Sequence, residues 1–173
     1  MSLPPGLERL NALDADEARS EFLRCCGSAR WAGAMASRRP FRDAGDLFDC
    51  ARKIERGLSR EDWIEAFRHH PRIGDKEALR LKFASTRAWA AGEQGGAALA
   101  SEKTLEDLAR ANGEYEKRFG YIFIICATGK SAEEMLQALR SRLSNAPDAE
   151  LGAAAAEQSK ITRLRLEKLL HNS

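Results

Sequence analysis

The stretch "AFRHHPRIGD", residues 66–75, places two of the chain's three histidines side by side. His70 directly precedes Pro71, and because a proline disfavours helix in the residue before it, the pattern predicts a helix that ends at His70. The dipole at a helix C-terminus favours a protonated imidazole and so raises the histidine pKa into the working range of a general acid or base. The alternative is a histidine that only bonds the last carbonyls of its helix, and the residue types alone do not decide between the two.

The other two histidines are predicted to have no chemical role. His69 points about 100° around the helix from its neighbour, so we expect it to be structural, and His171 belongs to the end of the chain. Zinc-binding histidines on a helix are spaced i, i+4 or accompany paired cysteines at defined gaps. Adjacent histidines do not satisfy that spacing, and the four cysteines show no CxxC pattern. The sequence therefore predicts no metal site.

Three further charged residues are candidates for binding or catalysis. Glu93 lies in "WAAGEQGGAAL" among glycines, and Arg163 and Arg165 lie in "KITRLRLEKL". Each has a plain alternative. An acid at a helix start is favourable when merely exposed, and arginines beside a buried stripe often keep their heads in solvent.

The elements that must position these residues are predicted to be helices. Apolar residues recur at helical spacing along most of the chain. Three helix starts carry a serine or aspartate with an acid three residues on, namely Asp14 with Glu17, Ser59 with Asp62, and Ser131 with Glu134. The last helix is expected over 148–170, with Ile161, Leu164 and Leu169 facing inward. The pattern indicates an all-α bundle of about eight helices.

One segment departs from this pattern. "GYIFIICATG", residues 120–129, is rich in aromatic and β-branched residues and would be a strand by propensity. No second strand-like run exists in the sequence to pair with it. It is therefore either paired with its own copy in a dimer or a buried extended connector, and the buried backbone of such a connector must bond other groups. A small polar ligand could be one such group.

Bulk composition limits the remaining possibilities. The 173 residues suit a single domain, 1–173, with 43% hydrophobic and 31% charged residues and a formal net charge of +2. Since no basic face or tail stands out, we expect no nucleic-acid partner. No apolar run is long enough to span a membrane, and the start of the sequence lacks the features of a secretory signal. The cysteines are expected to be reduced thiols, which indicates a cytoplasmic protein.

Several short motifs, in order, resemble one family. They are "CGSARWAGAM", "RPF" at 39–41, "HPRIGD" at 70–75, "GEQ" at 92–94, "YEKRFGYIFIICATGKSAEEML" at 115–136 and "EQSKITRLRLEKL" at 157–169. Together they are similar to the OHCU decarboxylases, from about residue 7 to 170. These enzymes convert 2-oxo-4-hydroxy-4-carboxy-5-ureidoimidazoline (OHCU) to (S)-allantoin in urate degradation. The resemblance implies an all-α fold, a homodimer, a small-molecule substrate and no cofactor.

The resemblance also implies roles for particular residues. They are His70 as the catalytic histidine, Glu93 as the catalytic carboxylate, the backbone of Pro71 and Ile125 as ligand-binding groups, and Arg165 as the ligand-binding arginine. Arg163 remains an alternative for the last role, because the register of the helix is open. Where the family often has serine three residues before the glutamate, this chain has Ala90. A hydrogen bond to ligand at that position would be missing or supplied by water.

A cofactor-free decarboxylation is chemically consistent with these residues. Loss of CO2 leaves an electron pair on carbon, and the ring C=N bond of this substrate can accept it, whereas many decarboxylases recruit a cofactor for that purpose. His70 would bond or deprotonate the hydroxyl, Glu93 would orient ring and ureido N–H groups, and Arg165 would offer a planar fork to oxygens. Two alternatives stay open: another enzyme of cyclic ureides, such as a hydrolase, and a non-enzymatic helical interaction module.

Overall fold

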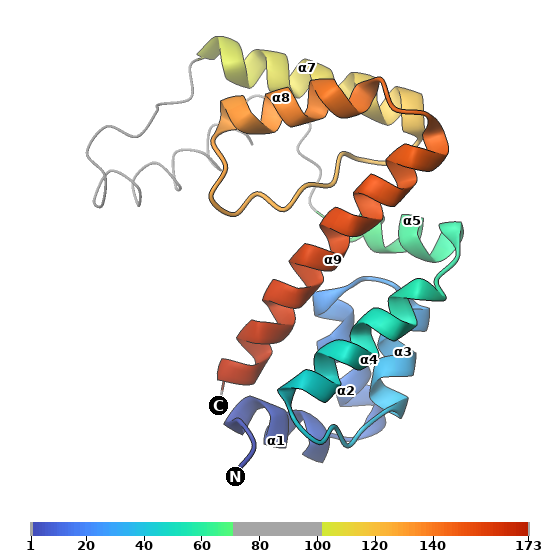
Figure 1. The fold of residues 1–173 in the computed structure, drawn as a ribbon, viewed down its shortest axis with the longest axis vertical. Coiled ribbons are helices and arrows are strands. Elements are labelled where there is room, and N and C mark those ends of the chain that lie inside the picture. The colour runs from blue at the N-terminus through green and yellow to red at the C-terminus, as the bar shows by residue number, and fades with distance from the viewer. Residues whose placement is uncertain (1, 71–101, 173) are drawn as a thin grey trace, which may run out of the picture. The chain divides into compact units, whose positions relative to one another are not determined.

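The computed structural model describes residues 2–70 and 102–172, and in those ranges it contains eight helices and no strand. The helices are α1 (Pro5–Ala12), α2 (Ala15–Cys25), α3 (Ala29–Ser37), α4 (Ala44–Arg56), α5 (Arg60–Arg68), α7 (Glu102–Phe119), α8 (Ala132–Leu143) and α9 (Pro147–His171) (Figure 1). The predicted all-α class is confirmed. The chain divides into two compact units, residues 1–70 with 153–173 and residues 71–152. Helix α9 contributes its first turns to the second unit and the rest to the first.

The helix starts follow the capping signals of the sequence. The side chains of Asp14 and Ser59 each accept a hydrogen bond from the backbone N–H three residues on. Each residue also donates its own backbone N–H to the carboxylate at that position, which completes a capping box. At α8 the cap differs in detail. The Ser131 hydroxyl accepts from the Glu134 N–H at 3.1 Å, but the Glu134 carboxylate bonds that same hydroxyl at 3.2 Å rather than the backbone.

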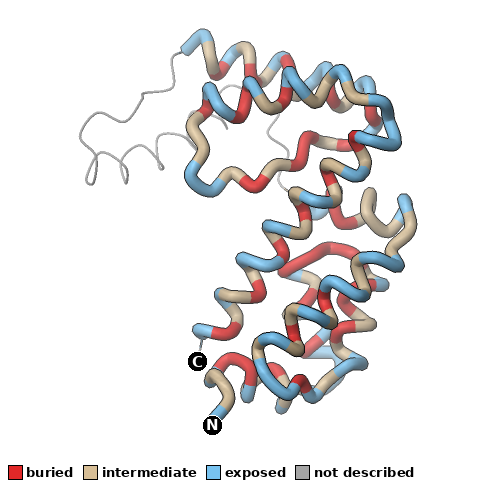
Figure 2. The backbone as a smooth tube through the Cα atoms, in the orientation of Figure 1, coloured by how far each residue is buried: buried red, intermediate tan, exposed pale blue. Residues whose placement is uncertain are grey.

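The first unit has a hydrophobic core built around Trp31 of α3. The Phe22 ring meets Trp31 edge-on at a centroid distance of 6.0 Å and meets Phe41 at 6.2 Å. The Trp31 indole N–H donates to the carbonyl of Ala51 at 3.3 Å, so its one polar group is also satisfied. Buried residues of this unit gather between α2, α3 and α4 (Figure 2). The start of the chain is fixed by Gly6, where an added Cβ would lie 1.9 Å from the Leu169 carbonyl oxygen of α9.

The second unit is organised around a buried carboxylate. Glu150, fully buried at the start of α9, accepts from the Tyr115 hydroxyl of α7 at 2.5 Å and from Arg142 Nε of α8 at 2.7 Å. Burial is the larger cause and the contact with Glu150 the smaller cause of a Tyr115 pKa above its ordinary value. The phenol therefore stays a hydrogen-bond donor. Asn145 donates to the other carboxylate oxygen at 3.0 Å. The carboxylate therefore joins α7, α8 and α9.

The aromatic segment after α7 is an irregular connector and not a strand. Its buried side chains are Tyr121, Phe123, Ile124 and Cys126. Arg142 Nη1 donates to the Ile124 carbonyl at 2.7 Å, and Lys130 Nζ donates to the Cys126 carbonyl at 3.2 Å. These bonds agree with the expectation that the buried backbone would bond other groups. Within the single chain, the segment has the form of the connector that one of the two alternatives predicts.

The predicted inner stripe of α9 is right for Leu169, which packs partly buried against the core of the first unit, and wrong for Leu164. Leu164 is 37% exposed, and the residues that α9 buries from Ala153 onward are Ala154, Gln158, Thr162, Leu166 and Leu170. Two of these five are polar, so a search for apolar spacing selects the wrong face. Within the described ranges, none of the helices is both long enough and apolar enough to cross a membrane.

Arg142 is expected to be essential for the stability of the second unit. Its side chain is 13% exposed and its partner Glu150 is fully buried. Because Arg142→Met leaves a buried carboxylate without its cation, the free energy of unfolding should fall by roughly 3–5 kcal/mol. Arg140 of the same helix is the matched control, since its side chain is 60% exposed while it pairs with Asp107. Arg140→Met should cost no more than about 1 kcal/mol in a denaturant titration. Equal losses in the two variants would contradict the account.

Candidate functional site

His70 lies just past the end of α5 and is bonded to a buried amide. The helix ends at Arg68 with His69 as its cap, two residues earlier than the sequence predicts, but His70 N–H still bonds the Phe67 carbonyl at 3.2 Å. The His70 Nε2 atom is 2.5 Å from Gln158 Oε1 of α9. The ring is therefore at a helix C-terminus, where the dipole favours its protonated form.

The partner of His70 is itself held in place. Gln158 is completely buried and donates from Nε2 to the Thr162 hydroxyl oxygen at 3.1 Å, one turn further along α9. Thr162 is 1% exposed. A buried amide with both ends bonded cannot rotate without losing a hydrogen bond, so it presents a fixed oxygen to the histidine ring.

His69 has a packing role instead. A Cβ built on Gly27 would lie 2.3 Å from Cγ of the His69 ring, which shows how closely the ring lies on the backbone at that glycine. Nearby, the Glu65 carboxylate of α5 accepts from the Ala29 N–H at 2.7 Å, at the start of α3. These two contacts fix α5 against the α2–α3 junction and so set the direction in which His70 leaves the helix.

Arg165 caps the C-terminus of α2. Its Nη1 donates to the carbonyl of Arg24 at 3.2 Å and approaches that of Cys25 at 3.5 Å. A cation at this position is favourable because the last carbonyls of a helix carry partial negative charge. Seven residues separate Arg165 from Gln158, which is two helical turns, so both lie on one face of α9 about 10 Å apart along the axis.

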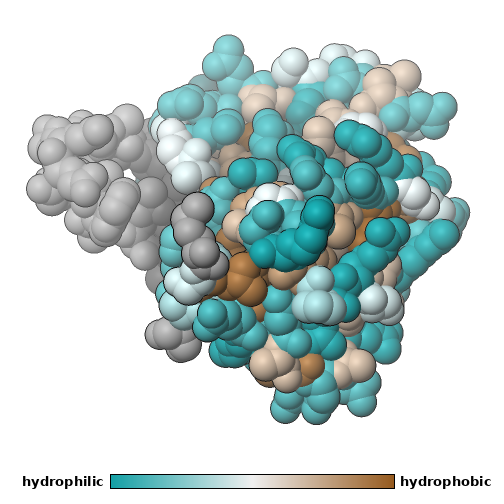
Figure 3. Space-filling model, turned by 60° about the horizontal axis from the view of Figure 1, so that its bottom comes forward, coloured by the Kyte–Doolittle hydropathy of each residue, from teal (hydrophilic) through white to brown (hydrophobic). Residues whose placement is uncertain are grey.

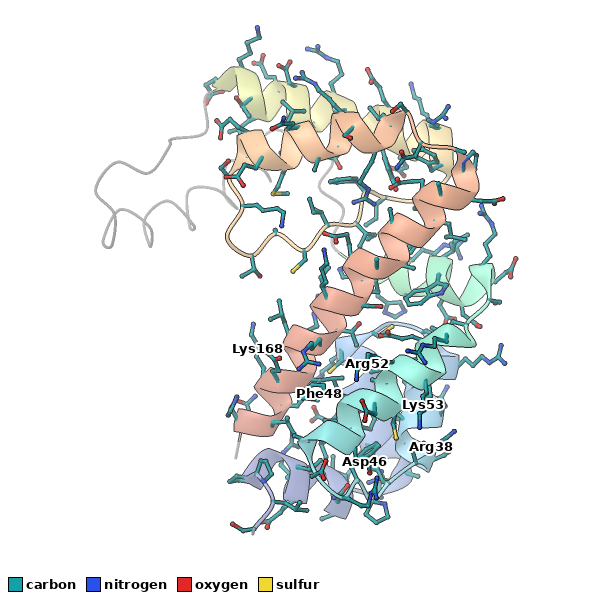
Figure 4. All side chains as sticks on the ribbon, viewed as in Figure 1. Arg38, Asp46, Phe48, Arg52, Lys53 and Lys168 are labelled. Carbon is teal, nitrogen blue, oxygen red and sulfur yellow. The ribbon has the colours of Figure 1, made fainter. Side chains whose placement is uncertain are left out.

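Arg163, the alternative arginine, lies on a different side of α9. Its guanidinium stacks over the Phe48 ring at 4.2 Å and pairs with Glu167 at 3.2 Å. It lines a cavity of about 190 Å³ between α4 and α9, toward which Phe48 and Arg52 of α4 are directed (Figure 4). Glu55, also on this cavity, has its pKa raised by burial and accepts from the Ser159 hydroxyl at 2.9 Å. Arg165, rather than Arg163, thus shares the face of α9 that holds His70.

The remaining predicted site residues are placed as follows. Ile125 is half-buried in the connector of the second unit, whereas His70 and Arg165 belong to the first unit. Pro71, Ala90 and Glu93 lie outside the described residues. Among the residues that the structure does describe, no group of three or more histidine, cysteine or acidic side chains could hold a metal ion.

Gln158 and Thr162 are the residues that the sequence analysis missed. A signal was present, because Gln158, Thr162 and Arg165 are spaced i, i+4, i+7 and therefore share one helix face. In a helix searched for apolar spacing, that row of polar residues looks like a solvent-facing side. Only the fold shows that two of the three are buried.

The class of the protein follows from a solved structure with the same all-α fold. A crystal structure of an OHCU decarboxylase in the presence of (S)-allantoin matches with a TM-score of 0.72 and 38% identity. The match covers 88% of this chain and 98% of that one. The profile of the OHCU decarboxylase family matches residues 11–167. The chain therefore belongs to the OHCU decarboxylase family, a family of enzymes.

Individual relatives agree with this assignment. The uric acid degradation bifunctional protein TTL of Arabidopsis thaliana is 38% identical over 149 residues, which are 86% of this chain and 46% of the relative. The 2-oxo-4-hydroxy-4-carboxy-5-ureidoimidazoline decarboxylase of Amia calva is 33% identical over 141 residues, covering 80% of this chain and 79% of the relative. The chain thus spans less than half the length of the bifunctional plant protein and most of the fish protein.

The thiols beside this face are expected to be unreactive in the native state. Burial raises the pKa of Cys25 to about 12 and that of Cys26 to about 11, although a hydrogen bond from Ser28 opposes the shift at Cys26 and the charge of Arg165 opposes it at Cys25. The thiolate is the reactive form, and below these pKa values both groups stay protonated. Near neutral pH, iodoacetamide should therefore modify the half-buried Cys50 first, and Cys25 and Cys26 only after denaturation. Mass spectrometry of the labelled peptides measures this, and rapid native labelling of Cys26 would contradict it.

Proposed function

We propose that this protein decarboxylates OHCU to (S)-allantoin. The observation that carries the proposal is the fixed histidine. His70 stands at a helix end with its Nε2 atom bonded to a buried amide, in a chain of the OHCU decarboxylase family. A relative of similar fold was crystallised in the presence of (S)-allantoin. Family and geometry thus support the same residue as the centre of the chemistry.

The proposed reaction needs no electron sink other than the substrate. The bond to the carboxylate breaks, and its electron pair moves into the ring toward the adjacent C=N bond. The hydroxyl-bearing carbon becomes a carbonyl as its proton leaves, and the neighbouring carbon accepts a proton. The protein must hold the ring, exchange these protons and protect one face. We assign the hydroxyl proton to His70, which is a general acid–base role.

Four further residues are proposed to contact the substrate. Arg165 offers a planar guanidinium to carbonyl or carboxylate oxygens, and its place on the face of α9 that holds His70 supports it over Arg163. Glu93 would orient ring and ureido N–H groups, and the backbone of Pro71 and of Ile125 would bond ring oxygens. These three assignments rest on the family resemblance.

We further propose that the chain acts as one domain, as a homodimer, in the cytoplasm. One family match extends from residue 11 to residue 167 and so includes residues of both compact units. The dimer rests on resemblance alone. All four cysteines are thiols and not disulfides, which a reducing compartment favours.

The two alternative functions have less support. A hydrolase of cyclic ureides would need a metal or an activated nucleophile, and the thiols of Cys25 and Cys26 are held protonated by burial. An interaction module would present a large exposed apolar surface. On the face drawn in Figure 3, hydrophilic residues dominate and hydrophobic ones lie between them.

The paired variants His70→Asn and His69→Asn test the assignment. General acid–base assistance contributes roughly 10²–10⁴-fold to rate, so His70→Asn should lose about that much kcat while keeping its circular dichroism spectrum. His69 packs on Gly27 and has no proposed contact with the substrate. Its variant should therefore lose far less kcat, even if the protein is less stable. The rate is followed by the ultraviolet absorbance of freshly prepared OHCU. Equal activity of the two variants would show that His70 is not the chemical residue.

A further inference from the structure

We propose that Gln158 is a positioning residue that fixes the tautomer of His70, with the proton on Nε2, so that Nδ1 is the nitrogen that exchanges a proton with the substrate. The part of this proposal that concerns catalysis rests on the proposed function of His70. The part that concerns the tautomer rests only on the contacts among His70, Gln158 and Thr162.

The orientation of the Gln158 amide follows from its contact with Thr162. The amide NH2 group donates to the Thr162 hydroxyl oxygen at 3.1 Å, one turn further along α9. Both side chains are buried, so neither has solvent as an alternative partner.

This orientation leaves the amide oxygen of Gln158 facing the histidine. An amide oxygen only accepts, so the ring nitrogen 2.5 Å away must carry a hydrogen. Nε2 therefore keeps its proton in both the neutral and the charged ring. Proton gain and loss take place at Nδ1.

The burial of the glutamine indicates a role beyond packing. On the same face of α9, Ala154, Leu166 and Leu170 fill buried positions with apolar side chains, whereas Gln158 is fully buried and polar. Burying an amide costs free energy that its hydrogen bonds only offset. A leucine could fill the space without that cost, but it could not specify which ring nitrogen is protonated.

The tautomer can be read directly by nuclear magnetic resonance. In the full chain labelled with ¹⁵N-histidine, long-range proton–nitrogen correlations show which ring nitrogen carries the hydrogen. We expect the wild-type ring of His70, identified by its loss in His70→Asn, to be protonated at Nε2. An Nδ1-protonated neutral ring in the wild type would overturn the proposal.

Two variants test the cause of that tautomer. Gln158→Leu removes the acceptor, and Thr162→Val removes the hydroxyl that orients the amide while keeping its shape. In each, the Nδ1-protonated form should appear and kcat should fall roughly 10–100-fold, by analogy with the loss of the partner of a metal-binding histidine, with KM little changed. Thr162→Ser keeps the oxygen and should restore the wild-type tautomer with most of kcat. If Gln158→Leu does not fold, the valine–serine pair at 162 carries the test.

Ser159 offers a control position on α9. Ser159, next to Gln158 but bonded to Glu55 on the other side of α9, should change neither the tautomer nor kcat when replaced by alanine. The proposal would be overturned if the Thr162→Val variant kept both the wild-type tautomer and the wild-type kcat. The variants could change the tautomer as expected while the wild-type protein fails to decarboxylate OHCU. That result would support the role of Gln158 in fixing the tautomer. It would reject both the proposed function and the proton-exchange role of Nδ1.

Discussion

The hydrogen-bonding demand of buried polar side chains on α9 is the constraint on which the rest of the structure depends. A helix that turns Glu150, Gln158 and Thr162 inward must supply each with a partner, since an unsatisfied buried polar group costs about 1–3 kcal/mol. In the first unit the oxygen of Gln158 is bonded to His70, and its nitrogen is bonded to Thr162. The same bonds that make the burial tolerable therefore also fix the imidazole at the end of α5. Stability and the placement of the proposed catalytic histidine come from one set of contacts.

The second unit meets the same demand with charge. Arg142 bonds both the buried Glu150 carboxylate and the carbonyl of Ile124, directly before the predicted ligand-binding backbone of Ile125. The guanidinium also lies 4.5 Å from the centre of the Phe123 ring. A connector without strand partners is therefore held by a side chain whose own position is set by a buried carboxylate. This support allows an irregular backbone to remain inside a helical protein.

Much of the fold can be predicted from the sequence because the signals that begin and end a helix lie within a few residues of each other. The caps at Asp14 and Ser59 need only residues three apart, and the cluster of apolar side chains around Trp31 follows from helical spacing. His70 as a candidate also follows from local features, namely the proline after it and the helix end. The inner face of α9 cannot be found this way, because Gln158 and Thr162 are polar and only their distant partners explain their burial. For the same reason, a single sequence does not choose between Arg163 and Arg165, whereas their different contacts with Phe48 and with the end of α2 separate the two.

The central claim is that the protein breaks the bond to CO2 and also controls where the proton returns. In free solution the planar species left by CO2 loss accepts a proton on either face, whereas a ring held in one orientation beside a single acid accepts it on one face. The most direct test is to run the reaction in D2O and to analyse the allantoin early, before it racemises. The account predicts deuterium at the new stereocentre and the circular dichroism of the (S) form. Fast loss of OHCU with a racemic early product would contradict it, because the protein would then release the intermediate before protonation.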